Sequence, residues 1–280
     1  MSSPIITPRL KDGTIGLTPY RLVRFARRLI APLVLVVLWQ VAVDFLNFGS
    51  GFVPSPVEVV RTLLVWIFGL GSNDRFAGGW LASVVASTQR VGAGFFVASI
   101  FGLTIGTMIA RSEIAADIFD PILQVLRPIP VSAWVPFSMV FFGIGPTGAI
   151  SLVALGAFFP VVLNTVAGVR HVSELHLRSA KMLGAGPARS LFRVVLPSAL
   201  PSIFVGLRLA IGLSWVLLIV AEMVAVKSGL GYELWNAYYY NRMDLIVASM
   251  LTIGALGYAS DYVILLISAR VLRWRETTDI

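Results

Sequence analysis

Arg178-Ser179-Ala180-Lys181-Met182-Leu183-Gly184-Ala185, followed after a spacer by Val194-Val195-Leu196-Pro197, forms a short polar island between two long apolar blocks. Residues 173–183 are compatible with a helix that Gly184 would end, and Pro187 suits the first turn of a second helix. Small side chains allow a partner surface to approach the backbone closely. The stretch therefore predicts a docking helix for a cytoplasmic partner, although an ordinary basic loop that obeys membrane topology would have the same composition.

The composition around this island indicates that lipid is the solvent. Of the 280 residues, 57% are hydrophobic and only 13% are charged, whereas soluble domains carry about 25% charged residues. The absence of cysteine excludes disulfides and thiolate metal sites. A net charge of +8 is compatible with nucleic-acid binding, but the basic residues gather in loops, so membrane topology explains the charge better and no nucleic-acid partner is expected.

Six apolar stretches are long enough to be membrane spans, since a spanning helix needs about 20 mostly apolar residues. They lie at 29–46, 88–110, 118–142, 147–168, 198–225 and 244–269. The fold class is therefore predicted to be an all-α polytopic membrane protein with six transmembrane helices. Fifteen of the 22 Lys and Arg residues fall in loops on the side of the termini. This excess predicts that both termini lie in the cytoplasm.

The predicted organisation has three parts: a cytoplasmic N-terminal segment at 1–28, a six-helix domain at 29–275 that includes the loop 170–197, and a tail at 276–280. The basic start and the first apolar run also resemble a signal peptide, but the run is long and has no obvious cleavage site. Pro54-Ser55-Pro56 begins a short interfacial helix that ends near Leu70. Pro128, Pro130 and Pro136 predict a kinked or broken third span.

Two ionisable residues inside the spans are predicted to pair. Arg208 and Asp261 both lie roughly 14 Å from the cytoplasmic ends of their helices, at 1.5 Å per residue. We interpret them as a structural ion pair in preference to a substrate contact. Glu222 lies roughly 21 Å further along the helix of Arg208, near the outer end, where it would hold the Gly229–Gly231 loop or contribute to a gate.

Four further residues are candidates for a translocation pathway. Arg127 adjoins Pro128 and its charge suits an anion, although pairing with Asp120, seven residues earlier, is the main alternative. Trp134, Asn164 and Trp215 would line a cavity or simply pack.

Other patterns in the chain do not predict chemistry. Residues 143–148 match G-x-G-x-x-G, but both flanks are apolar spans, so an outer turn is favoured over a dinucleotide site. No phosphate loop of the G-x-x-x-x-G-K-[ST] kind occurs. His171 and His176 have no third ligand nearby, so no metal site is predicted. Gly102 and Gly106 predict close helix packing, either within the chain or between two copies.

The island resembles the conserved cytoplasmic loop of ABC-transporter importer permeases, written E-A-A, three residues, G, nine residues, I-x-L-P. Ser179 and Ala180 occupy the two Ala positions, Gly184 follows after three residues, and Val194, Leu196 and Pro197 end the pattern. Arg178 stands where Glu is expected. The stretches 54–59, 120–122, 127–130, 133–136, 142–145, 221–223 and 229–232 also resemble the nitrate, sulfonate, taurine and bicarbonate branch of these permeases.

The resemblance implies a type I importer fold and a permease subunit for a small anion that works by alternating access in the plasma (inner) membrane of a prokaryote. It also implies a second copy of the chain, cytoplasmic ATPase subunits that bind ATP and Mg, and a periplasmic or lipid-anchored binding protein. The residues expected to couple to the ATPase are Arg178, Ser179, Ala180, Leu183, Gly184, Ala185 and Pro197. The chain itself would have no catalytic residues and no cofactor. A carrier or channel without an ATPase, and a membrane-embedded enzyme, are the alternatives.

Overall fold

A computed structural model describes residues 19–46, 53–69 and 74–274, and every regular element in these ranges is helical. The chain forms two units, up to Glu58 and from Val59 onward, which are considered separately. The predicted N-terminal segment lies outside the described residues up to position 18, and so does the predicted tail.

The first unit contains α1 (Pro19–Leu46) and the start of α2 (Pro56–Phe68). Helix α1 begins at Pro19, ten residues before the predicted span at 29–46, so this span forms the C-terminal part of a longer helix. The predicted start of α2 is confirmed, because Ser55 and Glu58 form a capping box. The Ser55 amide donates to Glu58 Oε2 at 2.8 Å, and the Glu58 amide donates to Ser55 Oγ at 3.2 Å.

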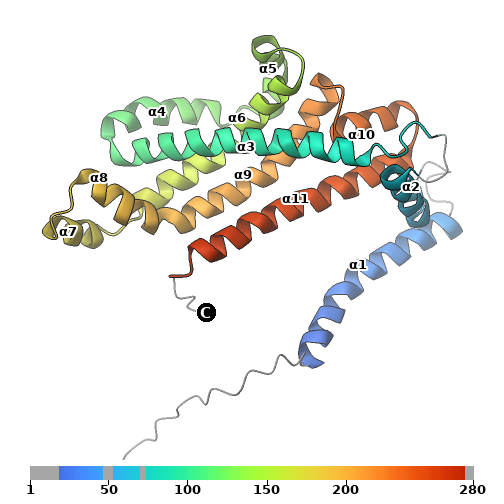
Figure 1. Ribbon diagram of the computed structural model, residues 1–280, viewed down its shortest axis with the longest axis horizontal. Helices are drawn as coiled ribbons and strands as arrows, with labels where there is room; N and C mark the ends of the chain where they lie inside the picture. The colour runs from blue at the N-terminus through green and yellow to red at the C-terminus, as the bar shows by residue number, and fades with distance from the viewer. Residues whose placement is uncertain (1–18, 47–52, 70–73, 275–280) are drawn as a thin grey trace, which may run out of the picture. The chain divides into compact units, whose positions relative to one another are not determined.

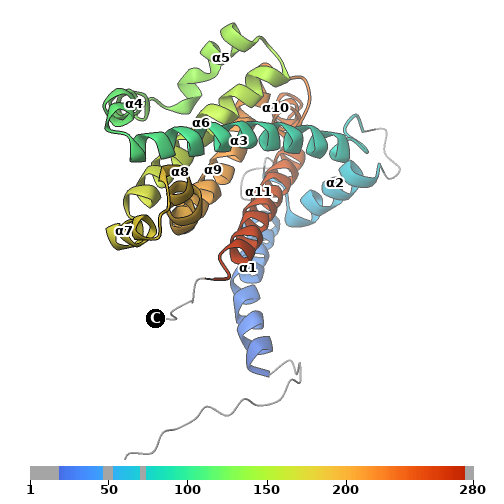
Figure 2. The same cartoon turned by 60° about the vertical axis from the view of Figure 1, so that its left-hand side comes forward.

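The second unit places three long helices side by side (Figure 1): α3 (Trp80–Arg111), α6 (Pro146–Arg170) and α9 (Leu196–Ala225). Helix α11 (Met243–Val271) packs on α9. At one end lie α7 (Glu174–Met182), α8 (Pro187–Ser190) and the π-helical turn η2 (Leu191–Val195); at the opposite end lies α10 (Leu230–Tyr239) (Figure 2). These are called the α7 end and the α10 end below.

The third predicted span is broken, as its prolines predicted. It consists of α4 (Glu113–Leu126), the 3₁₀ turn η1 (Val131–Trp134) and α5 (Val135–Phe142), with a bend of 96° between its two halves. Pro128 and Pro130 cannot donate backbone hydrogen bonds, and the residue before each proline is disfavoured in a helix. The chain direction therefore changes at this point.

Fewer helices than predicted meet the requirements of a membrane span. Among the described residues, four helices are long and apolar enough to cross a membrane, or five if the bent pair counts as one span. Helix α1 adds a further apolar stretch, Ile30–Phe45. The six predicted segments are helical apart from the break in the third, but the structure does not establish six spans.

Glycines set the distance between α3 and α6. A Cβ atom at Gly94 would lie 2.6 Å from the Val153 side chain, and one at Gly102 would lie 2.8 Å from Val161. At Gly106 it would lie 2.8 Å from Thr165. The small-residue face of α3 is therefore filled by α6 of the same chain, which excludes Gly102 and Gly106 as an interface between copies.

This packing yields a matched pair of substitutions on one helix. Gly102→Leu should destabilise the fold by about 1–3 kcal/mol, because the larger side chain must displace α6. Gly92→Leu should have little effect, since no atom of the described residues lies within 4 Å of a Cβ atom there. Thermal unfolding of the two purified variants in detergent measures the difference. Equal melting temperatures would contradict the packing described here.

Candidate functional site

The loop at the α7 end is a well-formed structural motif. Ser173 Oγ caps α7 by accepting from the Leu175 amide at 3.3 Å. The helix ends in a Schellman motif: the Ala185 amide donates to the Ala180 carbonyl at 3.0 Å, and the Gly184 amide donates to the Lys181 carbonyl at 2.9 Å. Gly184 has a φ of +74°, which disfavours side chains. The predicted ends of the two loop helices, at Gly184 and Pro187, are confirmed.

The base of this loop is buried against α6 and α9. Val169 of α6, Val195 of η2 and Ala199 and Ile203 of α9 form one apolar cluster. Val172, Leu177 and Leu191 pack against this cluster from the loop side. A force applied to the loop therefore reaches α6 and α9 through buried apolar contacts.

The tip of the loop is exposed and apolar. Met182 is 88% exposed and Leu183 is 86% exposed, which is unusual for such side chains unless a partner covers them.

A hollow of about 790 Å³ lies beside the tip. Of the residues predicted to couple, it brings together Ser179, Ala180, Leu183, Ala185 and Pro197. Arg178 pairs instead with Glu174 at 2.7 Å on the exposed face of α7, and neither it nor Gly184 lines the hollow.

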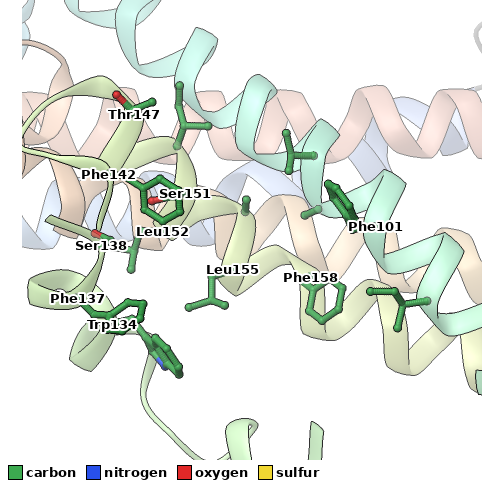
Figure 3. Close-up of a pocket in the computed structure, with 15 residues that line it drawn as sticks. Phe101, Trp134, Phe137, Ser138, Phe142, Thr147, Ser151, Leu152, Leu155 and Phe158 are labelled. Atoms are coloured by element: carbon green, nitrogen blue, oxygen red, sulfur yellow. The ribbon is translucent and has the colours of Figure 1, made fainter. Parts of the chain in front are cut away.

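A second hollow lies between α3, the bent pair and α6 (Figure 3). It measures about 530 Å³ and is almost entirely apolar, with Phe101, Trp134, Phe137 and Phe158 in its wall. The Trp134 Nε1–H is buried and has no hydrogen-bond partner among the described residues. Trp134 therefore lines a cavity, as one of the two readings of the sequence predicted.

Two other pathway candidates serve the packing of the helices. Trp215 is buried, and its Nε1–H donates to Ser260 Oγ of α11 at 2.8 Å. Asn164 donates to the Pro160 carbonyl of its own helix at 2.9 Å. Neither residue lines the apolar hollow of Figure 3.

Arg127 lies in a separate hollow between α4 and α6, of about 360 Å³. The alternative pairing with Asp120 is wrong: Asp120 accepts from Arg170 at 3.3 Å. The reason is the local fold, which brings Asp120 of α4 to Arg170 in the last turn of α6.

Glu222 is fully buried and is the centre of a polar network. Its carboxylate accepts from Arg90 Nη1 at 2.5 Å, from Ser87 Oγ at 2.9 Å and from the Gly231 amide at 2.9 Å. Arg90 also donates to the Ser228 carbonyl at 2.8 Å. The predicted contact of Glu222 with the 229–231 loop is thus present. It joins α3, α9 and the start of α10.

The sequence did not single out Arg90 as a site residue, because it lies at the outer boundary of the predicted span 88–110, where a charged residue resembles a loop residue. Helix α3 begins at Trp80, and Arg90 is buried within it. The polar residues Ser83, Ser87 and Arg90 recur at intervals of three or four, which is the helical period. That spacing was the available signal for one polar helix face.

Arg208 and Asp261 form a bidentate ion pair between α9 and α11. Arg208 Nε lies 2.9 Å from Asp261 Oδ1, and Nη2 lies 2.8 Å from Oδ2. The side chains are 43% and 33% exposed in the single chain. The pair is therefore not buried in the protein core, and its environment is completed by lipid, water or another chain.

A second ionic cluster lies at the α10 end. Arg242 bridges Asp74, at 2.7 Å, and Asp244, at 2.8 Å. Burial raises the pKa of Asp74, but the hydrogen bonds from Arg242 and from the Phe76 amide outweigh it and hold that pKa below its usual value. The neighbouring exposed side chains are aromatic: Tyr238, Tyr239 and Tyr240.

No group of three or more His, Cys, Asp or Glu side chains that could hold a metal occurs in the described part of the chain. His171 Nδ1 contacts the Ala167 carbonyl of its own helix at 2.8 Å.

Comparison with known proteins assigns the family. Residues 98–275 match the family described as binding-protein-dependent transport system inner membrane component. The chain is 33% identical over 246 residues to a putative ABC transporter permease of Methanocaldococcus jannaschii, covering 88% of this chain and 90% of the relative. It is 32% identical to the taurine transport permease TauC of Escherichia coli, covering 86% of each chain. It is 33% identical to the nitrate import permease NrtB of Synechocystis, covering 88% and 89%.

The chain therefore belongs to the inner membrane components of binding-protein-dependent transport systems. It is a multi-pass permease subunit rather than an enzyme, and its family works with an ATPase and a substrate-binding protein. The fold agrees. The inward-facing MetNI methionine ABC transporter contains a chain that superposes with a TM-score of 0.56 at 20% identity, covering 69% of this chain and 94% of that one.

The buried network predicts a large stability loss on removing one charge. Glu222→Gln should destabilise the fold by about 3–5 kcal/mol, because Arg90 is left as an uncompensated buried charge. Glu113→Gln, at an exposed carboxylate, should cost less than about 0.5 kcal/mol. Unfolding in detergent micelles with increasing SDS measures both. If the loss of unfolding free energy in the double variant Arg90→Gln/Glu222→Gln equalled the sum of the losses in the two single variants, the charges would not be coupled.

The Arg208–Asp261 pair predicts the same coupling between α9 and α11. Arg208→Ala and Asp261→Ala should each lower the yield of folded, assembled protein, and the double variant should lose less than the two effects combined. Size-exclusion chromatography of membrane extracts provides the yield. Additive losses would show that the two side chains act independently.

Proposed function

We propose that two copies of this chain form the translocation pathway of an ATP-driven importer for a small anion. Each copy would present its α7–α8 loop to a cytoplasmic ATPase subunit that binds ATP and Mg. The observation that carries the proposal is the exposed Met182–Leu183 tip on a loop whose base is buried against α6 and α9.

The orientation follows from the distribution of charge. Arg170, Arg178, Lys181, Arg189 and Arg193 all lie at the α7 end, and basic loops are retained in the cytoplasm. The α7 end would thus face the cytoplasm, and both termini would lie on that side. The α10 end would face outward, where the exposed tyrosines and the Asp74–Arg242–Asp244 cluster are available to a binding protein.

The coupling would be mechanical. When ATP binding brings two ATPase subunits together, the loop tips would move with them, and the buried loop bases would carry α6 and α9. A population shift between outward-open and inward-open states would follow, because ATP binds the two states with different affinity.

The substrate class is proposed from the relatives and from one local feature. Relatives are named for the transport of taurine, nitrate and bicarbonate. Arg127 supplies a positive charge at the break of the bent span, where it lines a hollow. A small inorganic or organic anion is therefore the proposed cargo.

Helix α11 has a largely exposed apolar surface that would be covered in the membrane. Only 11% of the most apolar stretch of α11 is buried by the described part of the chain. That surface would be covered by lipid and, in part, by the second copy. A carrier or channel that works alone would also have a lipid-facing surface. It would have no protein partner to cover an exposed apolar loop tip on the cytoplasmic side.

Capture of the ATPase tests the proposal. Met182→Asp/Leu183→Asp should abolish co-purification of an ATPase encoded beside this chain, because two carboxylates replace the apolar contact, while membrane insertion is retained. Tyr239→Asp, an exposed site at the α10 end, should capture the ATPase as the unmodified chain does. ATP-driven uptake should fall in parallel with capture. Uptake that persists in vesicles without any ATPase would support the carrier or channel instead.

A further inference from the structure

The hollow between α4 and α6 has one polar wall and one apolar wall. The α4 wall carries Asp120, Leu123, Gln124 and Arg127 at helical spacing. The α6 wall is formed by Phe159, Leu163, Val166 and Ala167, with Arg170 and His171 at its end. Its volume of about 360 Å³ lies at the lower end of the range found for small-molecule sites.

The charges in this hollow are unbalanced. Arg170 pairs with Asp120 through a single contact of 3.3 Å, and both side chains are partly exposed. Among the residues that the structure describes, no carboxylate lies within ion-pair distance of Arg127. Two guanidinium groups therefore face one carboxylate, which leaves one positive charge uncompensated beside an apolar wall. Arg127 is exposed in the single chain, so its charge is accessible to an anion, and the apolar wall beside it reduces the screening by water.

From this arrangement we infer that the hollow binds an oxyanion group between Arg127 and Arg170, and that Asp120 competes with the anion for Arg170. This inference rests on the proposed function, since it places an anion subsite in the proposed pathway. Guanidinium groups donate forked hydrogen bonds that match nitrate, carboxylate, sulfonate and phosphate oxygens. Gln124 adds an amide donor.

The Asp120–Arg170 contact then acts as a closing element at the α7 end. A single hydrogen bond of 3.3 Å is weaker than a bidentate pair. An anion held by Arg127 can therefore replace Asp120 as the hydrogen-bond acceptor of Arg170. The occupied hollow would lose the contact that joins α4 to the last turn of α6.

The same chemistry fits two sources of oxyanion. One is a free anion that travels along the pathway, and the other is the phosphate of an anionic lipid whose chain lies on the apolar wall of α6. Both need Arg127, so both are covered by the same inference. They differ in whether the binding depends on the surrounding lipid.

Thermal unfolding of the full-length chain in phosphatidylcholine nanodiscs tests the inference. Sodium nitrate and sodium ethanesulfonate are titrated against sodium chloride at constant ionic strength. We expect both oxyanions to raise the melting temperature of the unmodified chain saturably. Arg127→Gln should weaken the apparent affinity by about tenfold or more, as expected for a lost charge-assisted hydrogen bond. Arg111→Gln, an exposed arginine at the end of α3, serves as the matched control and should respond normally.

The Asp120→Asn variant separates an anion site from a purely structural arginine. Removal of the competing carboxylate should tighten oxyanion binding, whereas a structural role for Asp120 would only lower the melting temperature without ligand. Repetition in nanodiscs that contain phosphatidylglycerol distinguishes the sources. If this lipid alone raises the melting temperature in an Arg127-dependent way, the ligand is the headgroup phosphate.

An oxyanion response that is unchanged in Arg127→Gln, weakened binding in Asp120→Asn, or no response to oxyanion or lipid would each overturn the inference. The proposed function is judged separately by ATPase capture. A chain that captures its ATPase but shows no oxyanion response refutes only the anion subsite. A chain that responds to oxyanions but captures no ATPase refutes the importer.

Discussion

The arrangement of this protein depends on the close packing of α6 against α9. A Cβ atom at Gly168 would lie 2.8 Å from the Ser202 side chain, and one at Gly206 would lie 2.7 Å from Asn164. At Gly156 it would lie 1.8 Å from the Leu217 side chain. These glycines let the two helices approach closely along their length, as small residues do in membranes. The loop at the α7 end, which connects α6 to α9, is therefore attached to two helices that form one closely packed pair.

This packing gives a physical basis for coupling over distance. The loop base is buried at one end of the α6–α9 pair, and the Arg90–Glu222 network joins α9 to α3 and α10 at the other end. Packed helices are not continuously deformable, so a displacement of the loop tends to move the pair as a body. The bent span carries Arg127 and Trp134, and its η1 and α5 part packs on α6 whereas α4 packs on α3. It is therefore the element best placed to change its contacts when α6 moves.

The sequence was sufficient for the loop and for the ion pair but not for the polar network. Gly184 and Pro187 carry local backbone rules, so the ends of the loop helices followed from the residue types. The Arg208–Asp261 pair was predictable because both residues lie at the same depth from the cytoplasmic ends of their helices. Arg90 did not, because a charged residue near a span boundary looks like a loop residue until its buried partner is known. The partner of Asp120 was missed for a related reason, since only the fold brings Arg170 beside it.

The most direct test of the central claim uses the absence of cysteine from this chain. A single cysteine at Leu183, carrying a photo-crosslinker, should form an adduct with a nucleotide-binding ATPase in native membranes. The same cysteine should be unreactive toward a membrane-impermeant thiol reagent added outside intact cells, whereas one at Tyr239 should react. Labelling of the Leu183 site from outside, or adducts that contain no ATPase, would contradict the account.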